Sequence, residues 1–221
     1  RGENLSVRRT FGNHMVLQAG KPLPVEGRST PGSRVELEFG VTSASTVTDS
    51  KGDWKVTLPP QKASNLPKAL KVRSGGVTLQ FHDVLVGEVW LCAGQSNMEW
   101  MLRQSSHGLS EIREIETSAK EMQSVRLLNL EGAARGSSGS YTTQQVQRLT
   151  PDSFCQGSWQ RVSPKSASRF SAVAWYFGRK LQEELKIPVG LICPAMGGTP
   201  TEAWIPPAAF QEDPELQKLV Y

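Results

Sequence analysis

The 221-residue chain is long enough for one large domain or for a small domain joined to a larger one, and its 38% hydrophobic content permits a substantial core. Its 25 basic and 21 acidic side chains give a formal net charge of +4 and are scattered without a dense Lys/Arg block, which argues against nucleic acid as a partner. No apolar run approaches the roughly 18 residues of a membrane-spanning helix, so no membrane association is predicted.

Residues 1–83 show the pattern of short strands separated by turns. Apolar and polar side chains alternate with a period of two, and clusters of Gly, Pro, Asp and Ser interrupt the alternation. We therefore expect a small antiparallel β-sandwich over residues 1–83. Its predicted strands are residues 15–17, 23–25, 35–39, 54–58 and 77–81.

The pattern changes after residue 83, because residues 84–93 are almost continuously apolar, as in a strand that is covered on both faces. Strands and helices then alternate along residues 84–221, which predicts an α/β domain built on a parallel sheet. Residues 131–151 are of low complexity and are predicted to form a loop. The other predicted elements are strands at 125–130 and 189–193 and helices at 97–104, 109–122 and 171–185.

The predicted helix at 171–185 is amphipathic. Its apolar side chains recur at about four-residue spacing, which places them in one stripe of the kind that commonly faces a core. The stripe consists of Val173, Phe177, Leu181 and Leu185.

Three cysteines are present, at Cys92, Cys155 and Cys193. Their spacing is not that of a metal site, and an odd number cannot all pair within one chain, so at most one internal disulfide is possible. Cys92 and Cys193 each end an apolar run, where a free cysteine packs as a small hydrophobe. We predict neither a metal nor an organic cofactor.

Ser96 lies where a predicted buried strand passes through a glycine turn into a predicted helix. Unsatisfied N–H groups at such a helix start would stabilise an oxyanion formed by attack of Ser96 on a carbonyl. Serine and asparagine are also ordinary helix caps, and this generic pattern alone favours the structural role.

The amino-acid sequences of several segments are more specific than that generic pattern. Gly-Gln-Ser-Asn-Met at 94–98, preceded by Val-Gly-Glu-Val-Trp-Leu at 86–91, resembles the nucleophile block of the sialate O-acetylesterase family, a branch of the SGNH hydrolases. The likeness continues at 12–18, 170–179, 187–192 and 197–204, and so extends over almost the whole chain. It implies an SGNH-hydrolase-like three-layer domain with a parallel sheet over residues 84–221, incomplete in this chain, preceded by the β-sandwich of residues 1–83.

The resemblance also implies roles for individual residues. Ser96 matches the nucleophile that attacks an acetyl ester, and its N–H group together with that of Gly198, or of Gly197, matches the oxyanion hole. The implied substrates are O-acetylated sugars, with 9-O-acetylated sialic acid first and acetylated xylan second. The implied location is secreted, periplasmic or lysosomal.

Four further residues are candidates for substrate binding. Glu202 and Trp204 follow the glycine turn and could shape the pocket, although Trp204 could equally pack in the core. Gln95 and Asn97 flank Ser96 and could position the substrate, or they could make local hydrogen bonds in the turn.

A serine hydroxyl needs a base, which in this mechanism is a histidine oriented by a carboxylate. His14 and His82 fall in the predicted β-sandwich, where structural or surface roles are expected. His107 lies beyond the helix predicted to follow Ser96, which would carry it well over about 10 Å away.

We therefore expect the catalytic His and Asp to come from sequence beyond this chain, either in a longer protein or on a second polypeptide. The alternative is a non-catalytic carbohydrate-binding protein or an inactive fragment. A lipase or thioesterase of the same superfamily fits less well, because the N-terminal β-domain points to the sugar-esterase branch.

Overall fold

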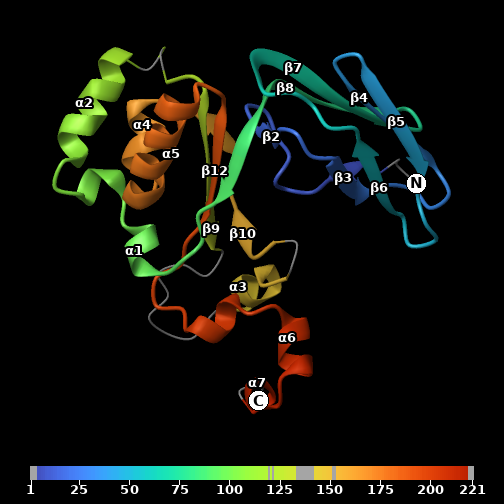
Figure 1. The fold of residues 1–221 in the computed structure, drawn as a ribbon. Coiled ribbons are helices and arrows are strands. Elements are labelled where there is room, and N and C mark those ends of the chain that lie inside the picture. Colours follow the sequence, from blue (N-terminus) through green and yellow to red (C-terminus); the bar gives the residue numbers. More distant parts are fainter. Residues whose placement is uncertain (1–3, 119, 121, 133–141, 151–152, 219–221) are drawn as a thin grey trace.

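The computed structural model describes residues 4–118, 120, 122–132, 142–150 and 153–218. They form a mixed α/β structure in which the chain is all strand and turn up to Leu91 and helices follow from Ser96 onward (Figure 1). Within these ranges, no helix has the length and apolar character needed to cross a membrane.

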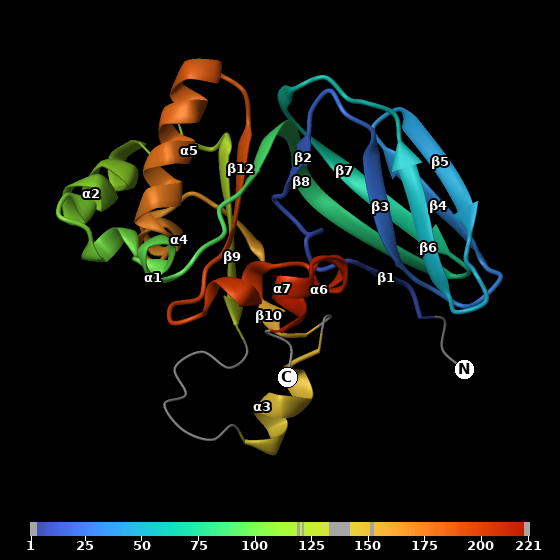
Figure 2. The same ribbon diagram turned by 60° about the horizontal axis from the view of Figure 1, so that its bottom comes forward.

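The N-terminal part consists of two facing sheets with a common core (Figure 2). In β4 (Arg34–Phe39) and β6 (Asp53–Leu58) alternate side chains are buried, which matches the period-two pattern of the sequence. Val35, Leu37 and Phe39 of one sheet are fully buried and pack with Val25 and Trp54 of the other. The smaller sheet contains β1 (Ser6–Val7), β3 (Leu23–Arg28) and β6 (Asp53–Leu58); the larger one includes β5 (Thr42–Val47), β4 (Arg34–Phe39), β7 (Ser64–Ser74) and β8 (Val77–Leu91).

Strand β8 connects the two parts of the molecule. It fuses the strands predicted at 77–81 and 84–93, pairs with β7 as far as Val86, and then pairs in parallel with β12 (Val189–Pro194) through Glu88–Leu91. The sequence boundary at residue 83 falls inside this strand, and the division into two domains there stays a prediction.

Strand β2 (Val16–Gln18) departs from the predicted antiparallel arrangement, because it runs parallel to β8. The Leu85 N–H donates to the Met15 carbonyl and the Ala19 N–H donates to the Gly87 carbonyl, at 3.0 and 2.7 Å. Val16 and Leu17 are buried beside β8, and the burial of their apolar side chains stabilises this parallel pairing.

The C-terminal part is built on parallel strands in the order β9 (Val125–Gly132), β12 and β8. Helices lie on one side of this sheet (Figures 1 and 2), whereas Leu128, Trp159 and Ile192 pack into the core of the N-terminal sheets. The second helical layer of a three-layer domain stays a prediction. The remaining elements of this part are α2 (Gly108–Ser118), α3 (Thr143–Arg148), β10 (Cys155–Gln156), β11 (Trp159–Arg161), α4 (Pro164–Ser168) and α5 (Ala172–Leu185).

The helix predicted at 97–104 is broken in two. Helix α1 (Ser96–Glu99) is a single turn, and a 3-10 turn, η1 (Leu102–Gln104), follows after an extended link. The link pairs with the start of α5, since the Leu102 N–H donates to the Phe170 carbonyl and the Ala172 N–H to the Trp100 carbonyl, both at 2.8 Å. Leu102 is fully buried, and its burial stabilises this extended link between α1 and η1.

The predicted apolar stripe of α5 is not its buried face. Ala172, Ala174, Trp175 and Gly178 are buried instead, and Gly178 lets the helix approach the sheet so closely that a Cβ there would lie 2.4 Å from Leu191. Val173, Phe177 and Leu185 of the predicted stripe are exposed, and Leu181 is half-buried. The reason is that α5 is apolar on two sides and packs through the side with small residues.

Other predicted bounds also change. The helix predicted at 109–122 runs from Gly108 to Ser118, and the predicted loop at 131–151 contains α3, whose start is capped by Thr142 through the Gln145 N–H. Residues 133–141 and 151 of that loop lie outside the described residues.

An ionic cluster around Asp83 joins strands from both parts. The Asp83 carboxylate accepts hydrogen bonds of 2.7 Å each from Arg126 of β9, Arg161 of β11 and His14. Burial would raise the pKa of Asp83, but these hydrogen bonds outweigh it and lower the pKa to about 2. The carboxylate is therefore ionised at neutral pH and pairs with Arg126, whose side chain is 3% exposed.

Candidate active site

Two turns lie side by side at the carboxyl ends of β8 and β12. The Cys92 N–H donates to the Ile192 carbonyl at 2.7 Å, and the Met196 N–H donates to the Gly94 carbonyl at 3.0 Å. These bonds continue the parallel pairing of the strands into the turns, where Gly94 and Ala195 form an isolated bridge. Carboxyl ends of parallel strands are the usual location of ligand sites in open α/β sheets.

This pairing brings the predicted nucleophile to the predicted glycine turn. A Cβ built on Gly197 would lie 3.6 Å from both the Cα and the Cβ of Ser96, which is van der Waals contact. Residues about 100 positions apart in the sequence, Ser96 and Gly197, therefore form one site.

Ser96 itself is exposed and is the first residue of α1. Gln95 occupies the N-cap position, and no side chain caps this helix. Ser96 and Asn97 therefore do not act as helix caps here. A single turn also carries little of the dipole expected for a longer helix. Any oxyanion here would be stabilised by individual N–H groups instead.

Glu99 is a site residue that sequence reasoning missed. It lies one helical turn after Ser96, and its Oε2 accepts the Gly197 N–H at 2.8 Å, which ties α1 to the glycine turn. The sequence offered one signal, an acidic residue directly after the Gly-Gln-Ser-Asn-Met block. This signal indicates a role only when the structure places the glycine turn beside α1.

The two glycines of the second turn differ. The Gly197 N–H is engaged by Glu99, whereas no acceptor in the described part of the chain takes the Gly198 N–H. Gly198 has a φ of +80°, a conformation that favours glycine, and a Cβ there would meet nothing within 4 Å. Gly198 thus borders open space and directly follows Gly197, which contacts Ser96.

Trp204 and Glu202 lie on a 3-10 turn, η2 (Thr201–Trp204), just after the glycines. The Trp204 Nε1 donates to Thr199 Oγ1 at 2.9 Å, and that hydroxyl donates to the Met196 carbonyl at 2.8 Å. Trp204 is 38% exposed, so the interpretation of Trp204 as a core residue was wrong. Glu202, like Gln95 and Asn97, is exposed; the role of all four in substrate binding stays a prediction.

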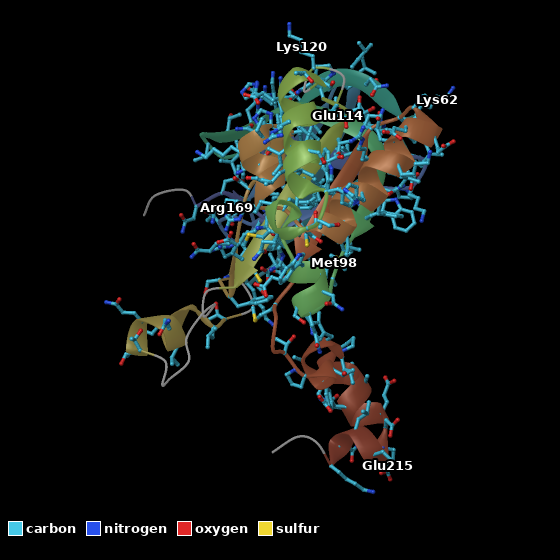
Figure 3. The ribbon with its side chains drawn as sticks, turned by 90° about the vertical axis from the view of Figure 1, so that its left-hand side faces the viewer. Lys62, Met98, Glu114, Lys120, Arg169 and Glu215 are labelled. Carbon is cyan, nitrogen blue, oxygen red and sulfur yellow. The ribbon has the colours of Figure 1, made fainter. Side chains whose placement is uncertain are left out.

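Beyond η2, two short helices follow, α6 (Pro207–Glu212) and α7 (Pro214–Gln217), which extend away from the sheets (Figure 3).

Two separate hollows lie near the end of β9 and share some of their lining residues. A small hollow lies between α1 and β9 and is lined by Met98, Glu99, Asn129 and Arg169, among others. Asn129 and Arg169 also line an open cavity of about 580 Å³ beside α4, which has both polar and apolar walls and to which Lys165 contributes. Figure 3 shows Met98 and Arg169 on neighbouring parts of this side of the molecule. The two hollows offer hydrogen-bonding groups of the kind that bind sugars, and the smaller one is lined by Met98 and Glu99 of the helix that carries Ser96.

No histidine ring within the described ranges is hydrogen-bonded to Ser96. His14 pairs with Asp83, and the exposed ring of His82 lies 3.5 Å from the Gln80 amide nitrogen. His107 precedes α2, where its carbonyl accepts the Glu111 N–H. The described part of the chain also holds no group of three His, Cys, Asp or Glu side chains arranged for a metal ion.

The cysteines are free thiols. Cys92 and Cys193 are buried, as their position at the ends of apolar runs predicted, and Cys155 is half-buried. Burial raises the pKa of the Cys193 thiol to about 12, so Cys193 is a packed hydrophobe below the site rather than a nucleophile.

The chain is similar to enzymes that remove acetyl groups. It is 33% identical to a sialate O-acetylesterase from Pongo abelii and 32% identical to one from Homo sapiens, over 87% of this chain and 37% of each relative. The crystal structure of a carbohydrate acetylesterase from Xanthomonas citri matches 93% of this chain and 43% of its own chain, with a TM-score of 0.77 and 30% identity. No family model matches.

Proposed function

Because this chain is a homologue of the sialate O-acetylesterases, we propose that it forms the nucleophile-bearing part of a serine esterase that removes O-acetyl groups from sugars. The chain spans 37% of the length of the curated relatives that it matches, so the activity proposed is that of the whole protein. The proposed substrate is 9-O-acetylated sialic acid, with acetylated xylan as the second candidate.

In the proposed mechanism, the Ser96 Oγ attacks the acetyl carbonyl carbon while a base accepts the hydroxyl proton. The N–H groups of Ser96 and Gly198 bind the oxyanion of the tetrahedral intermediate. The bond between the acetyl carbon and the sugar oxygen then breaks, which leaves acetyl-Ser96, and the base returns its proton to the sugar oxygen as the sugar hydroxyl leaves. Water then attacks the acetyl-enzyme, and acetate leaves. We propose that the base is a histidine outside these 221 residues, because the three present are placed elsewhere.

The observation that carries this proposal is the juxtaposition of Ser96 with the glycine turn at the ends of two parallel strands. Gly198 is preferred over Gly197 as the second donor, because the Gly197 N–H is occupied by Glu99. Glu99 then has a positioning role, in that it holds the turn against α1.

The absence of a histidine bonded to Ser96 within the described residues favours one other candidate, a carbohydrate-binding protein without turnover. The cavity beside α4 would then hold a glycan that is not cleaved. The two candidates differ in a single observable, the release of acetate.

Acetate release by the full-length natural protein tests the proposal. Ser96→Ala should lower the rate with 9-O-acetylated sialic acid by at least about 1,000-fold. Ser106→Ala, at another exposed serine of the same region, is the matched control and should keep the parental rate. A Ser96→Ala protein with the parental rate would exclude Ser96 as the nucleophile, and glycan binding without any acetate release would favour the binding protein.

A further inference from the structure

A hollow lies at the end of the N-terminal sheets that is remote from the candidate site. It has a volume of about 720 Å³ and is bordered by three turns, residues 29–33, 48–52 and 75–76. The Ser29 N–H donates to the Gly52 carbonyl at 2.8 Å, and the Thr48 N–H donates to the Ser33 carbonyl at 3.0 Å, which ties the first two turns together. This end of the sheets points away from α2 and α5 (Figure 2).

Strand β8 separates the hollow from Ser96. Gly75, which lines the hollow, comes just before the start of β8, and Ser96 comes after its end. The 15 residues of β8 cover a strand length of about 45 Å, since a strand rises about 3.3 Å per residue. No residue that lines this hollow also lines either hollow near the end of β9. A ligand bound here would therefore take no part in the chemistry of Ser96.

Three serine side chains that line the hollow are hydrogen-bonded to one another. The Ser29 hydroxyl donates to Ser74 Oγ at 2.9 Å, and the oxygens of Ser74 and Ser33 are 3.1 Å apart. Ser29 and Ser74 are only 9% and 4% exposed. Because buried polar groups normally have their hydrogen-bonding capacity used, any capacity left over indicates what a ligand has to supply.

The proton of each serine hydroxyl already has an acceptor. Ser33 Oγ lies 2.6 Å from the Thr30 carbonyl oxygen, which therefore takes its proton. Ser74 is then the donor to Ser33, and Ser29 is the donor to Ser74. The 3.3 Å contact from Ser33 to Ser29 Oγ competes with the much shorter bond to Thr30, so Ser29 Oγ keeps its acceptor capacity. The cluster thus requires a ligand that donates a hydrogen bond.

Charged groups beside the cluster balance one another. Lys51 and Arg28 line the hollow; the Lys51 ammonium group makes no hydrogen bond within the described part of the chain, and Arg28 pairs with Asp53 at 3.1 Å. The hydrogen bond from the Asp53 N–H and, less strongly, the nearby Lys51 lower the pKa of Asp49, so this carboxylate is ionised. Two cations therefore lie next to two carboxylates, which gives no preference for an ionic ligand. Pro31 adds an exposed apolar surface.

We propose that this hollow binds a neutral sugar unit of a glycan. A sugar hydroxyl both donates and accepts hydrogen bonds, so one hydroxyl donates to Ser29 Oγ while another accepts from the Lys51 ammonium group. The C–H groups of the sugar ring pack on Pro31, in the combination of apolar and polar contacts that is typical of small-molecule sites. The site holds a glycan without chemistry, and it does not depend on Ser96 as a nucleophile.

Lysine labelling of the full-length natural protein tests this site. Lys51 lines the hollow, and Lys55, an exposed lysine of β6 outside the hollow, is the internal control. For a dissociation constant of about 10 mM, about 50 mM sugar slows the acylation of a fully covered lysine about sixfold. We expect xylobiose or lactose to slow acylation of Lys51 by at least about threefold and to leave Lys55 unchanged, as measured by mass spectrometry of the digested protein.

Two variants connect this protection to the serine cluster. Ser29→Ala removes the free acceptor, while the protons of Ser74 and Ser33 keep their acceptors, so the variant should fold and lose the protection of Lys51. Ser43→Ala, at an exposed serine of β5 outside the hollow, is the matched control and should keep the protection.

The other outcomes would overturn the proposal. They are no protection of Lys51 by either neutral sugar, equal protection of Lys51 and Lys55, protection by N-acetylneuraminic acid alone, and protection that Ser29→Ala retains. If Ser29→Ala does not fold, labelling of the unsubstituted protein decides. None of these sugars carries an acetyl ester, so the result is independent of acetate release and of the function proposed for Ser96.

Discussion

The ionic cluster around Asp83 predicts a large effect of a single substitution away from the candidate site. Asp83→Asn removes the negative charge that faces Arg126, Arg161 and His14 but keeps the size of the side chain. Asp83 has a φ of +56°, which asparagine adopts about as readily as aspartate, so the substitution adds little backbone strain. Its effect on stability therefore reports the loss of charge.

The size of the effect can be worked out in two ways. A shift in the pKa of Asp83 from 3.8 to about 2 corresponds to about 2 kcal/mol of stability at neutral pH. Leaving a buried cation such as Arg126 without its partner destabilises proteins by about 3–5 kcal/mol, while the half-exposed Arg161 adds little. We expect Asp83→Asn to lower the free energy of unfolding by about 2–4 kcal/mol.

Urea unfolding of the full-length protein, followed by circular dichroism, measures this change. Asp53→Asn is the matched control, because Asp53 pairs with Arg28 at an exposed site, and it should change the free energy by less than about 0.5 kcal/mol. The folded-state pKa of Asp83 lies below 3.8, so its contribution is complete above about pH 4 and is lost as the pH falls through about 2. Equal effects of the two substitutions, or a difference that does not shrink over that pH range, would refute the reasoning.

Three further predictions concern close packing and the turns. Gly178→Ala places a Cβ 2.4 Å from Leu191 and should lower the unfolding free energy by about 1–3 kcal/mol, as measured by the urea midpoint; an unchanged midpoint would contradict the packing. Glu99→Ala frees the Gly197 N–H and should reduce acetate release, whereas Glu99→Gln keeps an acceptor oxygen and should restore most of it; equal rates of the two variants would exclude the positioning role. Gly198→Ala should lower the unfolding free energy by only about 1–2 kcal/mol, because the new Cβ strains the positive φ but meets no neighbouring atom. It should nevertheless lower kcat by more than this loss of stability explains, and an unchanged kcat would exclude Gly198 as an oxyanion-hole donor.

The site turns were predictable from the sequence, but their surroundings were not. Apolar runs before Ser96 and Gly197 marked two strand ends, and parallel pairing brings such ends together. Glu99 was missed because its partner is an N–H group 98 residues away, which no local pattern encodes. The break after α1 was missed for the same reason, since backbone pairing with Phe170 overrides the helical pattern.

Periodicity predicted which elements form better than which faces they bury. Helix α5 forms almost as predicted, yet its apolar stripe through Val173 and Phe177 is exposed, because Gly178 permits a closer approach on the other side. Periodicity reports where apolar side chains lie on a helix. It does not report how closely the helix backbone can approach a sheet at a glycine such as Gly178. Strands β5 and β7 were missed because Thr42–Val47 and most of Ser64–Ser74 lack large buried side chains. The secreted, periplasmic or lysosomal location stays a prediction.

The most direct test of the central proposal is to trap the acetyl-enzyme. The full-length natural protein is mixed with an O-acetylated sugar, quenched in acid within milliseconds and digested, and the peptide that contains Ser96 is analysed by mass spectrometry. The proposed mechanism predicts that this peptide gains the mass of one acetyl group on Ser96, and that the gain decays as acetate appears. Acetate release at a normal rate, with the acetyl group on another residue or on none, would contradict Ser96 as the nucleophile.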